Sequence, residues 1–194
     1  MKRVFLFVLM MKVLFAAAQT EEQGWTYRIA VGVGVGHSPS FEESKNGLGA
    51  MIDFSLQKNR SLLALSYRAT GEAQLLAQAS PSHTMSSVDF LYGWVLSEKK
   101  LLLSLSAGAG FTTSLERGAL VSSGPGIFSP RHYAKLRMHA LGLPVSAIAL
   151  LQIGSKARVG FEGYYNLNRL HNFYGINLVA SFGKYAVRRK KKSE

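Results

Sequence analysis

The chain has 194 residues and no cysteine, and it carries 23 Lys and Arg residues against 11 Asp and Glu residues, a formal net charge of +12. The length suits a single domain, and the lack of cysteine excludes disulfides, thiol chemistry and cysteine-based zinc sites. Such a charge would suggest nucleic-acid binding in a soluble protein, but part of it is terminal, because Lys2, Arg3 and Lys12 lie near the start and residues 188–192 are all basic.

The first 18 residues have the pattern of a secretory signal peptide. A positively charged start precedes an apolar stretch at 4–15, and three alanines at 16–18 suit a cleavage site. Lys12 interrupts the apolar stretch, which is shorter than the about 20 residues of a membrane-spanning helix. We therefore expect a signal peptide at 1–18, a barrel domain at 19–185 and a basic periplasmic tail at 186–194.

After the leader, apolar and polar residues alternate in segments of about ten residues, the pattern of β-strands long enough to cross a bilayer when tilted. The segments are 25–36, 47–57, 61–70, 85–96, 101–112, a sixth that ends at 151, and the two arms of a hairpin at 157–184. Tight turns at 58–60, 97–100 and 153–155 alternate with mostly longer connections, the longest expected at 113–133. An even strand count with this alternation is typical of bacterial outer-membrane barrels.

The sixth segment contains two irregular features. Pro144 removes a hydrogen-bond donor from its ladder, and the basic residues Lys135, Arg137 and His139 have the parity of the apolar face. Either a bulge resets the register here, or these bases project beyond the membrane.

The face opposite the apolar one is rich in small residues, which suit the crowded interior of a narrow barrel and disfavour a soluble, lipocalin-like barrel with a water-facing outer surface. Equal numbers of opposite charges on that face predict an interior charge network of Arg28, Asp53, Arg68, Asp89, Arg158 and Glu162. Aromatic residues near strand ends predict two membrane-interface belts, formed by Trp25, Tyr27, Trp94 and Phe182 on the periplasmic side and by Tyr67, Phe111, Tyr165 and Tyr174 on the outer side. The expected fold is all-β, an eight-stranded antiparallel up-and-down transmembrane β-barrel.

Three parts of the sequence resemble the small eight-stranded outer-membrane β-barrel proteins. They are the leader, the segment Ala140-Leu141-Gly142-Leu143-Pro144-Val145, and the closing residues 174–184. The sequence resembles the OmpA/OmpX-like barrels, and especially the outer-membrane β-barrel domain proteins of the Bacteroidetes type. The resemblance implies a barrel in a membrane and no single activity. Unlike many such barrels, the chain continues past its last strand into the basic tail.

Catalytic constellations are weak in this sequence. His37 with Ser38, or His132 and His139 with Ser129, could act as base and nucleophile, but no spacing defines a triad. No zinc-protease, EF-hand or P-loop motif is present. We therefore expect no catalytic residue, no cofactor and no metal site.

The sequence favours an outer-membrane, monomeric protein with a structural, adhesive or envelope-assembly role and a packed polar interior. Its expected partners are outer-membrane lipid and lipopolysaccharide, whose phosphates Arg131, Lys135 and Arg137 would meet, together with an envelope protein; nucleic acid is not expected. The basic tail either binds lipid phosphates or an acidic partner, or is a solvated terminus. The alternatives are a lipid A-modifying enzyme acting at the external rim, a small porin-like channel and a soluble ligand carrier.

Overall fold

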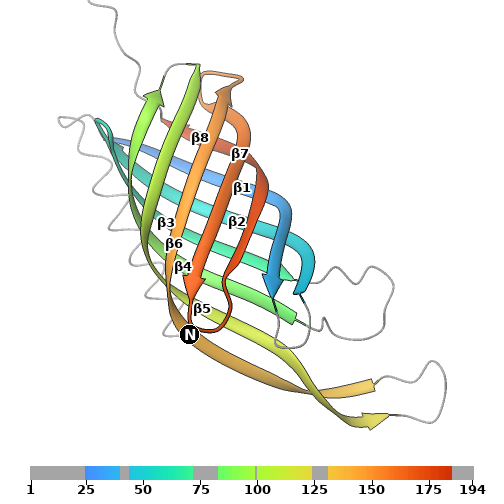
Figure 1. Cartoon of the computed structure of the whole chain (residues 1–194). Coiled ribbons are helices and arrows are strands. Elements are labelled where there is room, and N and C mark those ends of the chain that lie inside the picture. The colour runs from blue at the N-terminus through green and yellow to red at the C-terminus, as the bar shows by residue number, and fades with distance from the viewer. Residues whose placement is uncertain (1–24, 40–43, 72–82, 99, 124–130, 185–194) are drawn as a thin grey trace, which may run out of the picture.

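The computed structural model describes residues 25–39, 44–71, 83–98, 100–123 and 131–184, which form eight antiparallel strands in a closed ring, in chain order (Figure 1). The strands are β1 (Trp25–Pro39), β2 (Ser44–Lys58), β3 (Ser61–Gly71), β4 (His83–Glu98), β5 (Leu101–Ser123), β6 (Arg131–Gln152), β7 (Ala157–Asn168) and β8 (Phe173–Lys184). This confirms the fold class expected from the sequence. The expected signal peptide and basic tail lie outside the described residues, within which no helix is long and apolar enough to cross a membrane.

Antiparallel pairing between the first and last strands closes the ring. Val31 in β1 lies opposite Ile52 in β2 and opposite Ala180 in β8. The connections after β2, β4 and β6 are short and lie at one end of the barrel, called the turn end below. Asn59 makes the first of these turns with a φ of 56°, a left-handed conformation that asparagine adopts more readily than most residues.

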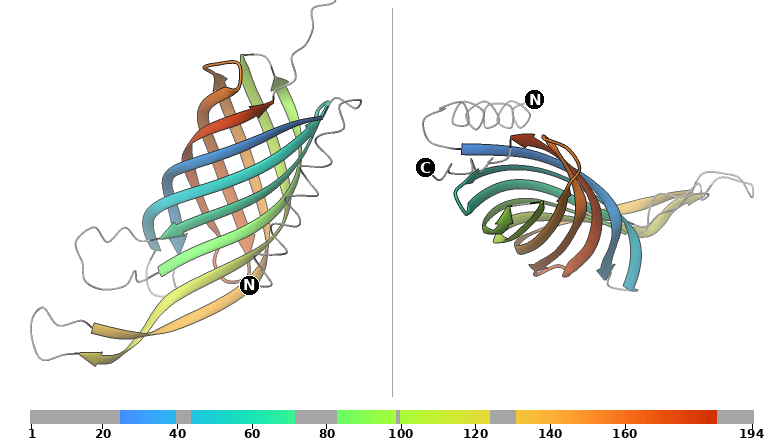
Figure 2. Two further views of the ribbon diagram at one scale, coloured as in Figure 1. Left: turned by 180° about the vertical axis from the view of Figure 1, so that it is seen from behind. Right: turned by 90° about the horizontal axis from the view of Figure 1, so that it is seen from above.

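A two-stranded hairpin projects from the opposite end, called the hairpin end (Figures 1 and 2). β4 pairs with β5 only as far as Glu116, and β7 pairs with β6 only from Gly142 onward. Beyond these residues, β5 and β6 pair with each other up to Ser123 and Arg131. The prediction of a long loop at 113–133 was therefore wrong over most of its length, because two strands can continue pairing where neither face needs to be apolar.

The register across Pro144 decides between the two readings of the sixth segment. Ala107 pairs with Val145 and Gly110 with Gly142. The two strands advance by the same number of residues between these pairs, so no bulge lies there. The same register continues to Arg117, which lies opposite Lys135. The basic residues of β6 therefore keep the outward parity without a bulge, and they lie beyond Gly142, where β7 stops pairing with β6. Their projection beyond the membrane stays a prediction.

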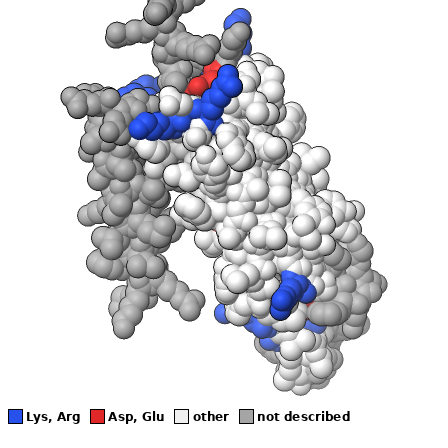
Figure 3. All heavy atoms as spheres, turned by 60° about the vertical axis from the view of Figure 1, so that its left-hand side comes forward, with Lys and Arg blue, Asp and Glu red and all other residues white. Residues whose placement is uncertain are grey.

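Large apolar side chains are exposed on the outer face of every strand. Examples, one from each strand in order, are Val33, Ile52, Tyr67, Phe90, Leu105, Leu141, Phe161 and Leu178. In the view of Figure 3, Lys, Arg, Asp and Glu gather at the two ends, and the wall between them is white. An apolar surface that surrounds the whole barrel is far larger than a soluble monomer tolerates, so it requires an apolar environment.

The interior holds buried polar side chains along its whole length, from Arg28 and Arg158 toward the turn end to Asn166 toward the hairpin end. An apolar cluster lies among them, from the middle of the barrel toward the turn end: Ala30, Met51, Leu62, Val95, Leu102, Ile148, Leu150 and Val179. The expected polar interior therefore includes an apolar cluster that the sequence analysis did not anticipate. The sequence signal is the paired leucines near the turns, such as Leu101 with Leu102, which make both faces of a strand apolar where the strand passes from the barrel to a turn.

Candidate functional site

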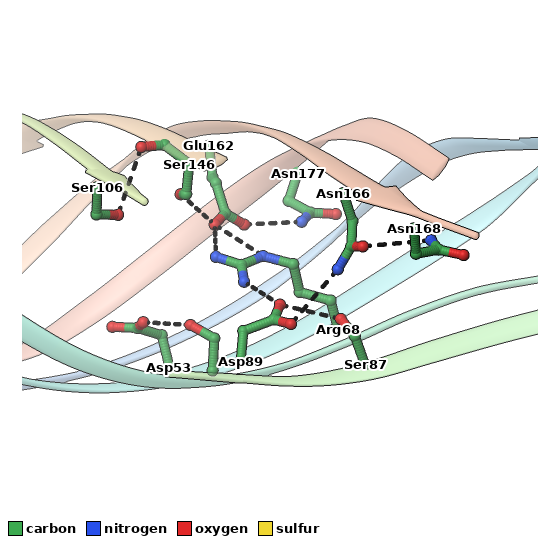
Figure 4. A network of polar contacts seen from close by, with 11 residues as sticks. Asp53, Arg68, Ser87, Asp89, Ser106, Ser146, Glu162, Asn166, Asn168 and Asn177 are labelled. Atoms are coloured by element: carbon green, nitrogen blue, oxygen red, sulfur yellow. Dashed lines mark hydrogen bonds and ion pairs between the residues drawn. The ribbon is translucent and has the colours of Figure 1, made fainter. Parts of the chain in front are cut away.

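A buried arginine connects opposite walls of the barrel interior (Figure 4). Arg68 on β3 donates from Nη1 to Asp89 Oδ2 on β4 at 2.8 Å, and from Nε and Nη2 to Glu162 Oε1 on β7 at 3.2 and 2.5 Å. All three side chains are at most 2% exposed. Side chains alternate between the two faces of a strand, so Arg68, Asp89 and Glu162 all point inward, and closure of the ring brings them together.

Neutral side chains donate further hydrogen bonds to the two carboxylates. Ser146 and Asn177 donate to Glu162 at 2.7 and 3.0 Å, and Ser87 donates to Asp89 at 2.9 Å. A buried carboxylate is costly unless it is paired and hydrogen-bonded, and both conditions are met here. The cluster therefore connects β3, β4 and β7 through a hydrogen-bonded ion-pair network inside the barrel.

The structure places all six residues of the expected charge network inside the barrel but does not join them into one cluster. Arg28 and Asp53 form a separate pair, with Nη2 and Oδ1 3.9 Å apart, and Arg28 Nε donates to Ser55 Oγ at 3.0 Å. Arg158 lies at the turn end, where its Nη2 donates to the backbone carbonyl of Glu98 at 3.4 Å.

Side chains fill the space that a channel would need. At the turn end, a cavity of about 10 Å³ is bordered by Thr26, Arg28 and Leu102, which is room for about one water molecule. Farther in, the backbone of Gly110 leaves space for the Asp89 carboxylate, which a Cβ atom at that position would strike. The lumen is therefore packed at both levels.

The aromatic residues expected at the membrane interfaces all occupy outward-facing positions. At the hairpin end, Tyr165 stacks on Tyr174 at 5.9 Å and Tyr174 on His37 at 5.0 Å, between ring centroids. The other two members of this group, Tyr67 and Phe111, both lie opposite Val88. The turn-end residues are Trp25, Tyr27, Trp94 and Phe182, of which Trp25 has the Lys58 ammonium 5.5 Å from its ring.

A cluster that sequence reasoning missed lies at the hairpin end, inside the rim. Ser38 Oγ lies 2.5 Å from His83 Nε2, and His83 Nδ1 and His171 Nε2 lie 3.5 and 3.6 Å from Glu116 Oε1. The order hydroxyl, imidazole, carboxylate is that of a nucleophilic triad. However, Ser38 is only 4% and His83 only 3% exposed, so the present geometry connects β1, β4, β5 and the β7–β8 turn rather than opening to a substrate.

Of the catalytic pairs considered from the sequence, the structure describes both members only of His37 and Ser38, and these two are not brought together. His37 points outward and contacts Asn46 Oδ1 at 2.8 Å, whereas Ser38 points inward. His139 contacts Thr113 Oγ1 at 3.0 Å, and Ser129 lies outside the described residues. No group of three or more His, Asp or Glu side chains in the described part of the chain is arranged to hold a metal ion.

Solved structures with the same arrangement are small bacterial surface barrels. Neisserial surface protein A matches with a TM-score of 0.55 at 12% identity, over 84% of this chain and 97% of that one. The attachment invasion locus protein Ail of Yersinia pestis matches with a TM-score of 0.56 at 13% identity, over 81% and 97% of the two chains. The fold is that of the small eight-stranded outer-membrane barrels.

The N-terminal β-barrel domain of Pseudomonas aeruginosa OprF also has this outer-membrane barrel fold, with a TM-score of 0.51 at 12% identity, over 83% of this chain and 98% of that one. No protein-family model and no curated protein matches the sequence. The OmpA/OmpX-like architecture is thus confirmed, and the narrower resemblance to the Bacteroidetes type stays a prediction.

Proposed function

We propose that this chain is an exported outer-membrane protein with a closed barrel and a structural or adhesive role, exerted through its projecting β5–β6 hairpin. The observation that carries the proposal is the pairing of an apolar outer face on all eight strands with a salt-bridged, packed interior. A membrane barrel needs the first, and a narrow barrel without a channel needs the second. The turn end then lies in the periplasm and the hairpin end outside the cell.

A lumen filled by side chains distinguishes this role from the porin-like alternative. Arg68 bridges from β3 to β7 across the interior, and leucines such as Leu102 and Leu150 fill the turn end below it. The folded protein in a planar lipid bilayer should therefore show no stable conductance steps. Regular steps from the unmodified protein would make it a channel instead.

The adhesive part of the proposal concerns anionic ligands. The described part of the hairpin exposes Lys135 and Arg137, and its single acidic residue, Glu116, points into the barrel toward two histidines. Ail, which shares the fold, has been solved in complex with the heparin analogue sucrose octasulfate. Lipopolysaccharide, which carries phosphates at the height of the rim, is the proposed partner here, and the proposed state is a monomer.

A lipid A-modifying enzyme is the second candidate, favoured by the contacts of His83 with Ser38 and Glu116. Burial of the Ser38 hydroxyl speaks against it. A serine-directed fluorophosphonate should leave the folded protein unlabelled. Stoichiometric labelling that disappears in Ser38→Ala would identify an active nucleophile and replace the structural role with a catalytic one.

A further inference from the structure

Two histidines, one from each flank of the β5–β6 hairpin, converge on the carboxylate at its root. Glu116 is the last residue of β5 that pairs with β4, and its partner is His83, the first residue of β4. His171 lies in the turn between β7 and β8, on the flank where β7 has stopped pairing with β6. Glu116 Oε1 lies 3.5 Å from His83 Nδ1 and 3.6 Å from His171 Nε2. The carboxylate therefore lies between the two parts of the barrel rim that flank the hairpin.

The contacts of Glu116 with the two imidazoles are too long for hydrogen bonds as they stand. Hydrogen bonds join nitrogen and oxygen at about 2.7–3.2 Å, and the covered Oε1 atom of Glu116 has no hydrogen-bond partner among the described residues. Ser38 Oγ lies 2.5 Å from His83 Nε2, and a hydroxyl can bond to this nitrogen whether or not the ring is protonated. Protonation of either imidazole would convert its contact with Glu116 into a charge-assisted hydrogen bond, which is shorter and stronger than a neutral one.

The other charged groups around this cluster keep a fixed charge. They are Arg117 on β5, Lys135 and Arg137 on β6, Lys45 opposite Ser38 on β2, and Arg169 in the β7–β8 turn. Lysine and arginine stay charged between pH 5 and pH 8, and the hydroxyl of Tyr164, which packs on Phe173, stays neutral.

An apolar layer lies between the cluster and the Arg68 network. Met85 and Phe173 lie two residues further into the barrel than His83 and His171, and both are fully buried. Among the described side chains that face the cluster, a pH-dependent charge therefore belongs to the two imidazoles and to Glu116.

We propose that Glu116, His83 and His171 form a proton-binding site that holds the hairpin against the barrel rim at acidic pH and releases it as the pH rises. The three side chains are at most 13% exposed, so an uncompensated carboxylate is costly here, and one bound proton brings the charge of the cluster to zero. Imidazole ordinarily gains its proton between pH 8 and pH 5, and two rings that share one carboxylate titrate as a unit. The proposal deepens the proposed function, on which it rests for the role of the hairpin, by giving the hairpin a regulator.

The test measures how tightly the hairpin is held, by double electron–electron resonance on the full mature chain in lipid nanodiscs. The chain has no cysteine, so spin labels attach uniquely at Val121→Cys on the hairpin and Leu167→Cys on β7, both exposed positions. The distribution of distances between the labels is recorded at about pH 8 and at about pH 5. We expect the narrow component of the held hairpin to grow at the lower pH. The ratio of held to free hairpin should rise roughly tenfold, because a charge-assisted hydrogen bond replaces a longer contact.

Matched variants assign the response to the cluster. Glu116→Gln keeps the shape of the side chain and removes its charge, and His83→Gln/His171→Gln removes both imidazoles. The control, His37→Gln/His139→Gln, removes two imidazoles from outward-facing positions at the same end of the barrel. The ratio should not depend on pH in the first two variants, and in the control it should change as in the unmodified protein.

An unmodified protein with the same distance distribution at both pH values would overturn the proposal. So would a response that persists in Glu116→Gln or in the double histidine variant, or one that is lost in the control. A heat-induced shift on a gel reports the folding of each variant separately, and His171→Gln alone, in a turn outside the strands, should weaken the response if the double variant does not fold. A folded barrel without a pH response removes the proton-binding site and leaves the proposed function standing. A barrel that responds to pH but does not bind lipopolysaccharide removes that function and keeps the site.

Discussion

At the scale of single residues, Arg68 connects more of the interior than any other side chain described above. It forms ion pairs with Asp89 and Glu162 at once, from a position that is 2% exposed. Removing the cation would leave two buried carboxylates facing each other across the lumen. Breaking a buried charge pair in this way typically costs about 3–5 kcal/mol, much more than the intact pair contributes against an apolar replacement.

Arg68→Met should therefore lower the free energy of unfolding by about 3–5 kcal/mol, measured by urea titration of the protein folded in lipid vesicles. The control is Arg60→Met, at an exposed position in the turn between β2 and β3, where a change within about 0.5 kcal/mol is expected. Equal stability of the two variants would show that the ion pairs of Arg68 contribute nothing to the stability of the barrel.

Gly110 tests the packing of the same region without changing any charge. A Cβ atom there would strike Asp89 Oδ1, whereas one on Gly163 would meet nothing within 4 Å. Gly110→Ala should destabilise the barrel by about 1–3 kcal/mol, the usual cost of overpacking, while Gly163→Ala should be nearly neutral. Thermal unfolding followed by circular dichroism measures both, and a neutral Gly110→Ala would mean that Asp89 can move freely inside.

Residue-level prediction from the sequence succeeded where alternation alone decides which face a side chain takes. The inward direction of Arg68, Asp89 and Glu162 follows from strand parity. Their partners do not follow, because Arg68 and Glu162 are 94 residues apart in the chain and meet only through ring closure. The contact of Ser38 with His83 was missed for the same reason.

At the scale of elements, the β5–β6 hairpin is the part of the fold least visible in the sequence. Serine, threonine and charged residues fill its strands, so the apolar period that marks the barrel is lost there although pairing continues. Register shifts between Arg117 and Leu120, and between Leu120 and Ser122, have no signal in the sequence. Without that register, the approach of Arg117 to Tyr133 could not be anticipated.

Shortening the hairpin should separate folding from binding. Replacing residues 117–135 by an Asn-Gly turn joins Glu116 to Leu136, which already lie opposite each other. Because β4 and β7 pair with the remaining parts of β5 and β6, the barrel should still form and still shift on a heat-modifiability gel. Binding of lipopolysaccharide to the refolded shortened protein, titrated in zwitterionic detergent micelles, should fall to background. Full binding by the shortened protein would place the function elsewhere.

At the scale of the whole molecule, the outer face and the interior of the barrel have opposite polarity, and this explains the composition of the chain. The outer face is apolar over all eight strands, and the polar groups that a soluble protein would expose are turned inward and paired with one another. The sequence predicted this inversion because small residues alternate with large apolar ones, which suits a narrow interior. It did not predict the apolar cluster within the interior, since paired leucines such as Leu150 and Leu151 fit either face.

Cell fractionation, followed by gel electrophoresis of the membrane fraction with and without boiling, tests the central claim most directly. The protein should be found in the outer membrane, should require detergent for extraction, and should migrate faster unboiled than boiled, because the closed barrel resists unfolding in detergent. A protein recovered free in the periplasm or medium, with one mobility under both conditions, would contradict the account and require that the apolar face of the strands be covered by something other than lipid.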